Sequence, residues 1–314
     1  MELYLIEPHI VLQSILNKCF ESSVESSILN NNRNKNGNPN INNITYSKIL
    51  NNPIFLSGGI GKLENFEKML KFPSDKIILK SSNTDDNINH NIYLTNISNT
   101  YSSNKSFYGE ILMKLSKSIP DGIICYFSSI SSMEFYIKKW QEQGVLDYIM
   151  NDKLLFVEES DSVRLADIIV NFKKSCDMGR GGILFLSTRN KASLHDSSLI
   201  NNQSRCIIFI GFPIETKLTK KFELEMENVK KNFEFDEKEY LNYDAFKLFS
   251  NKISEKIDGI TDKKVLVVLD EKLINDKLKD YLPSWLYKII HIDYDRENVN
   301  MEERLKNIKK FLNE

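Results

Sequence analysis

Short, uninterrupted runs of aliphatic and aromatic residues recur along this chain, and they restrict its possible folds more than any other feature. A strand with one face in water alternates apolar and polar residues, whereas a strand covered on both faces, as in a parallel sheet, is apolar throughout. The runs predict strands at Ile54–Ser57, Lys76–Leu79, Gly122–Phe127, Leu154–Val157, Gly182–Leu186, Cys206–Gly211 and Val265–Leu269, with a further strand near Ile92–Ile97.

Between these runs, apolar residues recur at helical spacing. Two such sets are Ile111, Leu112, Leu115 and Ile119, and Leu165, Ile168, Ile169 and Phe172. For the second set, Asp161 and Ser162 are alternative N-caps. Longer helices are predicted at Glu215–Phe233 and Glu237–Ile257, and an amphipathic closing helix at Met301–Leu312. Strands that alternate with helices through right-handed crossovers form a doubly wound α/β domain, with a mainly parallel sheet and helices on both faces.

The composition fits a folded chain without a strong charge preference. Hydrophobic residues make up 41% of the sequence and charged residues 27%, and the formal net charge is −1. A surface that holds DNA mainly through its phosphates usually carries a basic excess, so strong autonomous DNA binding is not expected. No apolar run approaches the roughly 20 residues that span a bilayer, so no membrane partner is expected. The N-terminus has no basic start followed by an apolar core, which argues against secretion.

The cysteines are too scattered to form a recognisable metal site. No two of the 4 cysteines form a CxxC pair, so the sequence predicts neither a zinc site nor an iron–sulfur cluster. Cys125 and Cys206 lie in apolar runs and are predicted to be small, buried hydrophobic residues. These features are typical of a reduced, intracellular protein.

Two segments are rich in Asn and Ser and poor in apolar residues. Residues 29–50 are predicted to be a disordered insertion, because such a composition buries too little surface to offset the entropy of ordering. Residues 81–104 are predicted to be partly flexible around their one strand. The N-terminal segment 1–28 is predicted to pack on the domain that residues 51–314 form.

The region between residues 119 and 191 carries a resemblance to a known family. It contains the segments WQEQGVL (140–146), NDKLLFVE (151–158) and GRGGIL (179–184), and its end overlaps the segment RNKAS (189–193). This succession closely resembles the second RecA-like domain of XPD-family DNA helicases, the helicase subunit of the transcription and repair factor TFIIH. The resemblance implies a RecA-like fold and a nuclear location. Agreement is best in the buried strands and worst in the functional loops.

A glycine-rich turn at 57–63 imitates a phosphate loop. A phosphate loop requires a glycine five residues before its Gly-Lys pair and a Ser or Thr after it, and here Leu56 and Leu63 occupy those positions. A tight turn into a helix at Leu63–Leu70 is therefore predicted. The resemblance agrees, because the phosphate loop of the family lies in the first motor domain.

The fifth helicase motif is only partly retained. In the family it reads approximately Arg-Gly-Lys-x-Ser-Glu-Gly-x-Asp-Phe, and Arg189, Lys191 and Ser193 match it. The glycines, the first acid and the later aspartate correspond to Asn190, His195, Leu194 and Ser197. The resemblance implies that the backbone freedom of the glycines and the carboxylates that couple nucleotide to DNA have been lost.

The sixth motif, Gln-x-x-Gly-Arg-x-x-Arg, has lost both arginines. The corresponding positions are Asn251, Ser254, Glu255 and Asp258. Arginine fingers stabilise a transferring phosphoryl group, whereas an acid repels a triphosphate. The resemblance therefore implies no catalytic residue and no metal ligand in this chain, and ATP with magnesium only if a separate first motor domain supplies the phosphate loop.

Polar residues follow two neighbouring strands at the edge where α/β domains bind ligands. The family uses this edge to touch the DNA backbone, which implies a weak nucleic-acid contact through Ser128, Ser129, Thr188, Arg189 and Lys191. Trp140 is predicted to be a core or subunit-contact residue rather than a base-stacking residue.

Three hypotheses about function follow from this pattern. The first is a non-catalytic scaffold that keeps its place among TFIIH-type subunits. The second is the C-terminal half of a split ATP-dependent DNA helicase that acts with a separate first motor domain. The third is a RecA-like interaction domain from an AT-rich genome with no TFIIH role, which the abundance of Asn, Lys and Ile suggests.

Overall fold

The structure is a computed structural model that describes residues 92–96, 106–189, 203–214, 220–232, 236–254, 256, 263–270, 281–293 and 301–313. The described residues belong to two compact units. The described part of the smaller unit consists mainly of helix α7 (Lys220–Asn232), on which Phe222, Met226 and Val229 are buried along one face. The predictions for residues 1–91, which include the insertion at 29–50, two strands and the glycine turn, lie outside the described residues.

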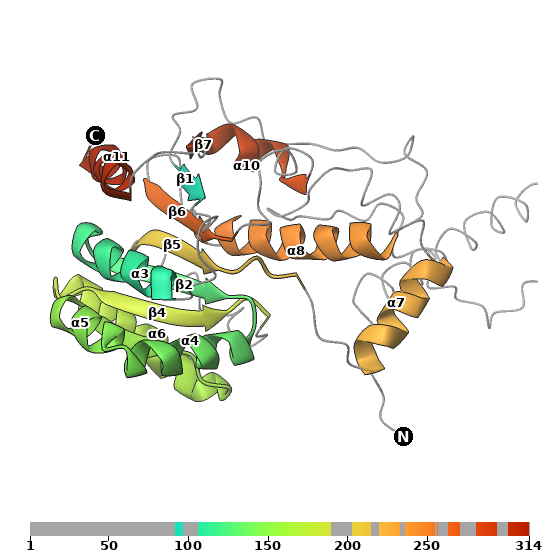
Figure 1. Ribbon diagram of the computed structural model, residues 1–314, viewed down its shortest axis with the longest axis horizontal. Coiled ribbons are helices and arrows are strands. Elements are labelled where there is room, and N and C mark those ends of the chain that lie inside the picture. The colour runs from blue at the N-terminus through green and yellow to red at the C-terminus, as the bar shows by residue number, and fades with distance from the viewer. Residues whose placement is uncertain are drawn as a thin grey trace, which may run out of the picture. The chain divides into compact units, whose positions relative to one another are not determined.

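A seven-stranded parallel sheet forms the centre of the other unit (Figure 1). Its strands, in chain order, are β1 (Ile92–Asn96), β2 (Gly122–Phe127), β3 (Leu154–Val157), β4 (Gly182–Ser187), β5 (Ser204–Ile210), β6 (Lys264–Leu269) and β7 (Ile290–Asp293). The spatial order is β3-β4-β2-β5-β6-β1-β7. Every residue of β2, β4 and β6 is buried, which explains why these strands are unbroken apolar runs in the sequence.

Helices cover both faces of this sheet. One face packs against α3 (Ser106–Ser118), α4 (Ile130–Glu142), α5 (Val145–Asp152) and α11 (Met301–Asn313). The opposite face packs against α6 (Ser162–Asp177), α8 (Glu237–Ser254) and α10 (Ser284–Ile289). Alternate residues of β2 enter the two layers, so that Ile123 faces one and Ile124 the other. The predicted RecA-like, doubly wound α/β fold is confirmed.

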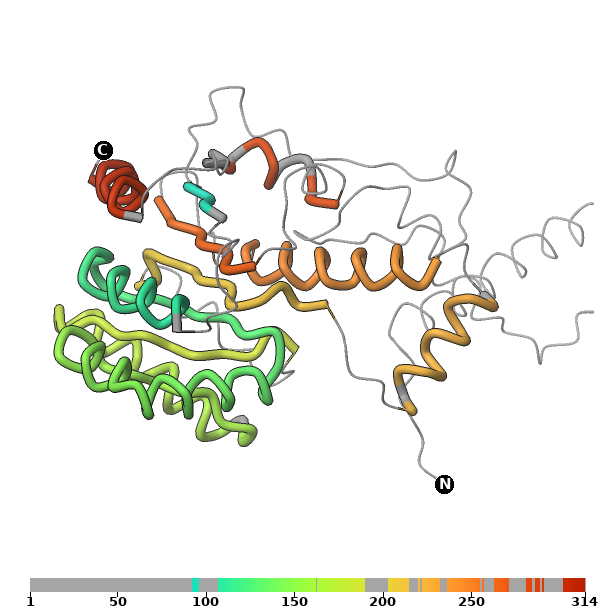
Figure 2. Tube along the Cα trace, in the orientation of Figure 1, coloured from blue at the N-terminus to red at the C-terminus, as the bar shows by residue number. Residues whose placement is uncertain are grey.

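The two layers are filled with aromatic side chains. Trp140 is fully buried, with its ring centroid 6.1 Å from that of Phe127 and 5.9 Å from that of Phe185. On the opposite face α8 runs beside β5 (Figure 2), where the ring centroids of Phe209 and Phe249 are 4.6 Å apart. The prediction that Trp140 is a core residue is confirmed. None of the described helices is both long enough and apolar enough to span a bilayer.

The cysteines of the sheet behave as predicted. Cys125 and Cys206 are fully buried, and burial raises the pKa of both thiols well above the usual range. Cys176 is also buried, and all three thiols are free. These residues therefore pack as small hydrophobic side chains.

Most predicted elements within the described residues are confirmed, but α5, α10 and β7 were not anticipated. Asp161 is the N-cap of α6, since its side chain accepts a hydrogen bond from the Val163 amide at 2.9 Å. Strand β7 was missed, and so was the short helix α10 before it. The reason is that β7 begins at Ile290, directly after the last residue of α10, with no turn residue to separate them.

The amino edge of the sheet is held by a compact polar cluster around Asp121. This residue has a positive φ of 56°, and its carbonyl accepts a hydrogen bond from the Lys153 ammonium group at 2.7 Å. Its carboxylate pairs with Arg205 at 3.4 Å. Burial lowers the pKa of Lys153, because the charged form loses hydration. The cluster connects the starts of β2, β3 and β5.

Gly122, at the start of β2, has no room for a side chain. A Cβ atom there would lie 2.6 Å from the backbone oxygen of Gln203 and 2.6 Å from the Phe172 ring. We expect Gly122→Ala to lower the free energy of unfolding by about 1–3 kcal/mol, as overpacking does. Denaturant unfolding measures the change.

The control for this substitution is Gly144→Ala. Gly144 has a φ of 70° and nothing within 4 Å of its Cβ position, so that its replacement costs only backbone strain of about 1–2 kcal/mol. A Gly122→Ala variant as stable as the wild-type protein would contradict the packing described for the start of β2.

Candidate nucleic-acid interface

The carboxyl ends of the central strands bring together loops that are far apart in the sequence. Phe127, the last residue of β2, is in register with Ser187 of β4 on one side and with Ile210 of β5 on the other. Ile210 is in turn paired with Leu269 of β6. The residues that follow these four positions therefore lie side by side, at the edge where parallel α/β sheets bind ligands.

Four of the five predicted contact residues lie at this edge. Ser128 and Ser129 follow β2, while Thr188 and Arg189 follow β4. Lys191 lies outside the described residues. The sequence thus identified positions that are neighbours in space. Whether these residues can bind a ligand depends on the contacts that their side chains make.

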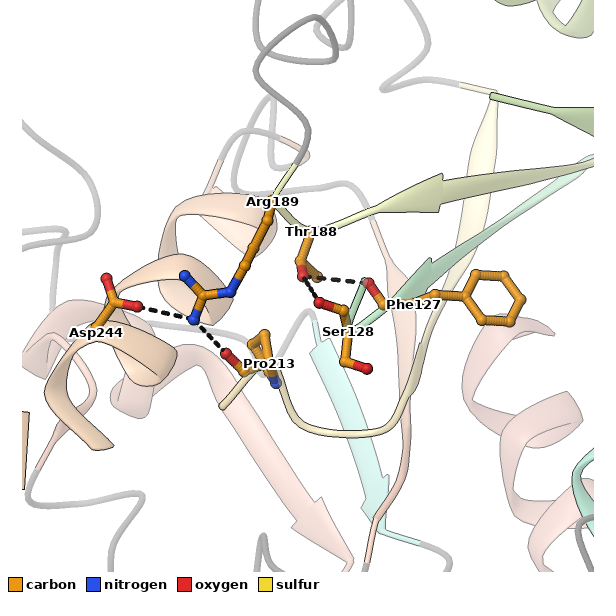
Figure 3. A network of polar contacts seen from close by, with 6 residues as sticks. All are labelled: Phe127, Ser128, Thr188, Arg189, Pro213 and Asp244. Carbon is orange, nitrogen blue, oxygen red and sulfur yellow. Dashed lines mark hydrogen bonds and ion pairs between the residues drawn. The ribbon is translucent and has the colours of Figure 1, made fainter. Parts of the chain in front are cut away.

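The hydroxyl group of Thr188 is turned inward. The residue is only 2% exposed, and its Oγ1 donates to the backbone oxygens of Phe127 at 3.2 Å and Ser128 at 3.3 Å (Figure 3). The backbone amide of Thr188 also donates to Phe127 O at 2.9 Å. Thr188 therefore joins the loop after β4 to the loop after β2.

Ser129 begins helix α4. Its backbone is extended, with a φ of −157°, and its Oγ accepts a hydrogen bond from the Ser132 amide at 3.1 Å. This cap places the N-terminus of a 13-residue helix at the carboxyl edge, where its partial positive charge favours an anion. Ser128, beside it, is partly exposed.

Arg189 links three segments of the chain. Its Nη2 donates to Asp244 Oδ2 at 2.9 Å and to the backbone oxygen of Pro213 at 2.7 Å (Figure 3). Asp244 belongs to α8 and Pro213 to the loop after β5. Both side chains of the ion pair keep some contact with solvent, at 27% exposure for Arg189 and 29% for Asp244. Sequence reasoning missed this partnership, and the separation of 55 residues gives no signal for it.

Two further carboxylates are fixed at the same edge by backbone amides. Glu158 is only 7% exposed, and its Oε2 accepts a hydrogen bond from the Ser187 amide at 2.5 Å. Asp270, directly after β6, accepts one from the Phe212 amide. Burial and the nearby Asp270 raise the pKa of the Tyr136 hydroxyl. The carboxyl edge thus carries Arg189 and three acidic residues, Glu158, Asp244 and Asp270, each bound by a group of the chain itself.

Of the degenerate sixth-motif positions, the described part of the chain includes Asn251 and Ser254. They lie near the end of α8, where Ser254 Oγ donates to the Asn251 backbone oxygen at 3.0 Å. The remaining motif positions lie outside the described residues, namely Asn190, Leu194, His195, Ser197, Glu255 and Asp258. Among described residues, no group of His, Cys, Asp or Glu side chains is placed to hold a metal ion.

Comparison with known proteins agrees with this architecture. The model of the family described as "Helicase C-terminal domain" matches residues 112–289, more than half of the chain. The chain belongs to the helicase C-terminal domain family.

The relatives of this helicase C-terminal domain include XPD proteins. The general transcription and DNA repair factor IIH helicase subunit XPD of Dictyostelium discoideum is 30% identical over 244 residues, which cover 74% of this chain and 31% of that protein. The XPD/RAD3 subunit of Saccharomyces cerevisiae is 27% identical over 205 residues, 65% of this chain and 26% of that protein. The ATP-dependent DNA helicase CHL1 of Scheffersomyces stipitis is 21% identical over 214 residues, 65% of this chain and 25% of that protein.

These matches confirm that the resemblance is to the C-terminal helicase domain of the XPD family. The helicase C-terminal domain spans less than a third of the length of each of these relatives.

Tyr243, next to Asp244 on α8, makes the stability of the folded domain depend on pH. Burial, with a contribution from Asp244, raises the pKa of its hydroxyl to about 12 from an ordinary value of 10. The folded state therefore holds this proton more tightly than the unfolded state. The resulting stabilisation is complete below pH 10 and is lost as the pH rises from 10 through about 12.

We expect Tyr243→Phe to weaken the alkaline loss of stability. The wild-type helicase C-terminal domain should lose about 2–3 kcal/mol more than the variant over this range. Denaturant unfolding at a series of alkaline pH values measures the difference, and phenolate absorbance follows the ionisation directly. Parallel curves for the two proteins would contradict the raised pKa.

Proposed function

We propose that this helicase C-terminal domain is a non-catalytic scaffold in a nuclear, TFIIH-type assembly. In this role it serves transcription initiation and nucleotide excision repair, and it contacts nucleic acid only weakly. The observation that carries the proposal is the internal engagement of Arg189, whose guanidinium group binds Asp244 and the Pro213 carbonyl.

The hydrogen bonds of the carboxyl edge favour a structural role over a catalytic one. A motor domain that turns over nucleotide needs edge side chains available for phosphate and for DNA. In this chain Thr188 joins two loops, Ser129 caps α4, and Arg189 joins three segments. These contacts stabilise the edge and leave less capacity for a ligand.

The distribution of retained residues points the same way. The strands that fill the core keep their apolar character, whereas the positions corresponding to the arginine fingers hold Glu255 and Asp258. A scaffold requires the packed sheet and its outer helices, and it does not require arginine fingers. Neither ATP nor magnesium is therefore part of the function proposed for this chain alone.

Partner binding is proposed from the relatives and from the helix surfaces. Related proteins are named as subunits of general transcription and DNA repair factor IIH. On α6, Val163 is 70% exposed and Val170 is 43% exposed, two positions that lie seven residues apart and share one side of the helix. Exposed apolar residues of this kind are suited to a contact with another protein subunit.

We expect the purified 314-residue chain to hydrolyse ATP no faster than the protein-free background, with or without single-stranded DNA. The reason is that neither a phosphate loop nor a sixth-motif arginine pair is present in its sequence. A coupled phosphate-release assay measures turnover. DNA-stimulated hydrolysis that disappears in an Arg189→Ala variant would contradict the non-catalytic role.

The scaffold role is tested by affinity purification of the tagged chain from its own cells, followed by mass spectrometry. We expect TFIIH-type subunits to be recovered without a second helicase half. The double variant Val163→Asp, Val170→Asp should lose them, because two charges replace exposed apolar side chains on α6. Lys138→Asp, an exposed change on α4 at the opposite face of the sheet, is the matched control and should retain them.

A different set of partners would support the rival function. Recovery of a phosphate-loop protein in equal amount would indicate a split helicase, and ATPase assays on that pair would follow. Recovery of neither kind of partner would contradict the scaffold proposal.

A further inference from the structure

We infer that two copies of this chain associate through α6, with the two helices packed antiparallel about a twofold axis. In the free chain, the outer face of α6 is thus covered by the same face of a second copy. The inference goes beyond the proposed function, because it concerns the chain before a TFIIH-type subunit is bound. Both contacts use Val163 and Val170, so self-association and binding of such a subunit exclude each other.

Helix α6 turns one face to the sheet and leaves the opposite face to solvent. Leu165, Ile169 and Phe172 are at most 1% exposed and pack in the core. On the opposite side, exposed positions recur at spacings of four, three and four residues, the spacing of the seam of a coiled coil. These exposed positions are Val163, Asp167, Val170 and Lys174.

Apolar side chains lie at the start, the middle and the end of this outer stripe. Val163 is 70% exposed, Val170 is 43% exposed, and Met178, directly after the helix, is 84% exposed. The Met178 amide still donates to the Lys174 carbonyl at 3.0 Å, so Met178 continues the helical turn. Apolar side chains arranged along one stripe gain free energy when a second helix covers them.

The two charged positions of the stripe determine the direction of packing. Asp167 and Lys174 are exposed, and neither forms an ion pair with another residue in the part of the chain that the structure describes. In a parallel pair of helices each would lie opposite its own counterpart, which places like charges together. In an antiparallel pair centred between them, Asp167 of one copy lies opposite Lys174 of the other. The twofold axis then repeats this ion pair.

The same centre aligns the apolar residues. The midpoint between Asp167 and Lys174 is also the midpoint between Val163 and Met178, and Val170 lies beside it. The antiparallel pair therefore brings Val170 of both copies together at the axis. An ion pair flanks this contact on either side, and Val163 meets Met178 at each end. One register satisfies the charges and the apolar side chains together, and this coincidence carries the inference.

The charged residues at the border of the stripe are engaged within the chain. Arg164 pairs with Glu159 at 3.0 Å, and the Asp177 carboxylate accepts a hydrogen bond from Gln203 Nε2 at 3.0 Å. Asp167 and Lys174 are therefore the charges of this face that a second copy would pair.

The size of the interface makes the dimer weak. Helix α6 has 16 residues and is about 24 Å long, so two such helices bury less than the area of about 1,200 Å² that marks a standard interface. We therefore expect a dissociation constant on the order of 10–100 μM. A partner subunit with a larger contact area displaces a dimer of this strength.

The test is sedimentation equilibrium of the purified full chain at concentrations from about 5 to 300 μM. We expect the average mass to rise from that of one chain toward that of two. Asp167→Lys and Lys174→Asp should each weaken self-association at least about tenfold, because each replaces two attractive pairs by two repulsive ones. Val170→Asp should have a similar effect, since it places two carboxylates at the axis.

A mixture of the Asp167→Lys and Lys174→Asp variants tests the antiparallel arrangement directly. One chain then carries two positive charges along the stripe and the other carries two negative charges, so both pairs are attractive again. We expect the mixture to associate at least as tightly as the wild-type protein, although each variant alone is monomeric. Damage to the fold of α6 would not be repaired by mixing.

Lys138→Asp is the matched control. It makes the same change of charge as Lys174→Asp, but at an exposed position of α4, which packs on the opposite face of the sheet. We expect its self-association to equal that of the wild-type protein, since α6 is unaltered. Circular dichroism verifies that every variant is folded.

Three outcomes would overturn the inference. The first is a wild-type chain that stays monomeric at every concentration. The second is a dimer that persists in both Lys174→Asp and Val170→Asp, because its interface would lie elsewhere. The third is a mixture of the two single variants that does not associate.

These outcomes leave the scaffold role intact, because affinity purification tests that role through other partners. Failure to recover TFIIH-type subunits would in turn leave a dimer of the purified chain unaffected. The two proposals therefore fail separately.

Discussion

Burial of both faces of the sheet is the constraint on which the remaining structure depends. Every residue of β2, β4 and β6 is buried between the two helix layers, so the centre of the domain offers no surface to a ligand or a partner. Binding is therefore confined to the ends of the strands and to the outer sides of the helices. The same burial preserves the apolar runs even where the loops of the family pattern have diverged.

The two ends of the sheet use ion pairs for different purposes. At the amino edge, Asp121 combines a positive φ with contacts to Lys153 and Arg205, so its interactions stabilise the starts of three strands. At the carboxyl edge, Arg189 joins the loop after β4 to Asp244 of α8 and to the loop after β5. A retained arginine can therefore be engaged by an acidic partner within the chain. Its presence in the sequence does not by itself establish that it is available to a ligand.

The sequence predicted the fold well where double burial controls residue choice. The run at Gly122–Phe127 matches β2, whose residues are all buried, and the run at Gly182–Leu186 matches all but the last residue of β4, which is likewise buried throughout. It failed at β7, where a strand follows α10 directly and no turn residue marks the change. The site was predicted only in part. The strand ends predict where residues such as Thr188 and Arg189 lie, but they do not predict which residues these side chains contact. The partners of these two residues lie 24 to 61 positions away in the sequence.

The contacts of Arg189 also join two segments that lie on either side of α7 in the sequence. The polypeptide leaves the sheet unit after Pro213, contributes α7 to the other unit, and returns through α8, which carries Asp244. One guanidinium group thus binds both the outgoing and the returning segment. Replacement of Arg189 would therefore detach two points of the chain at once, one where it leaves β5 and one where it returns along α8, although only a single side chain is changed.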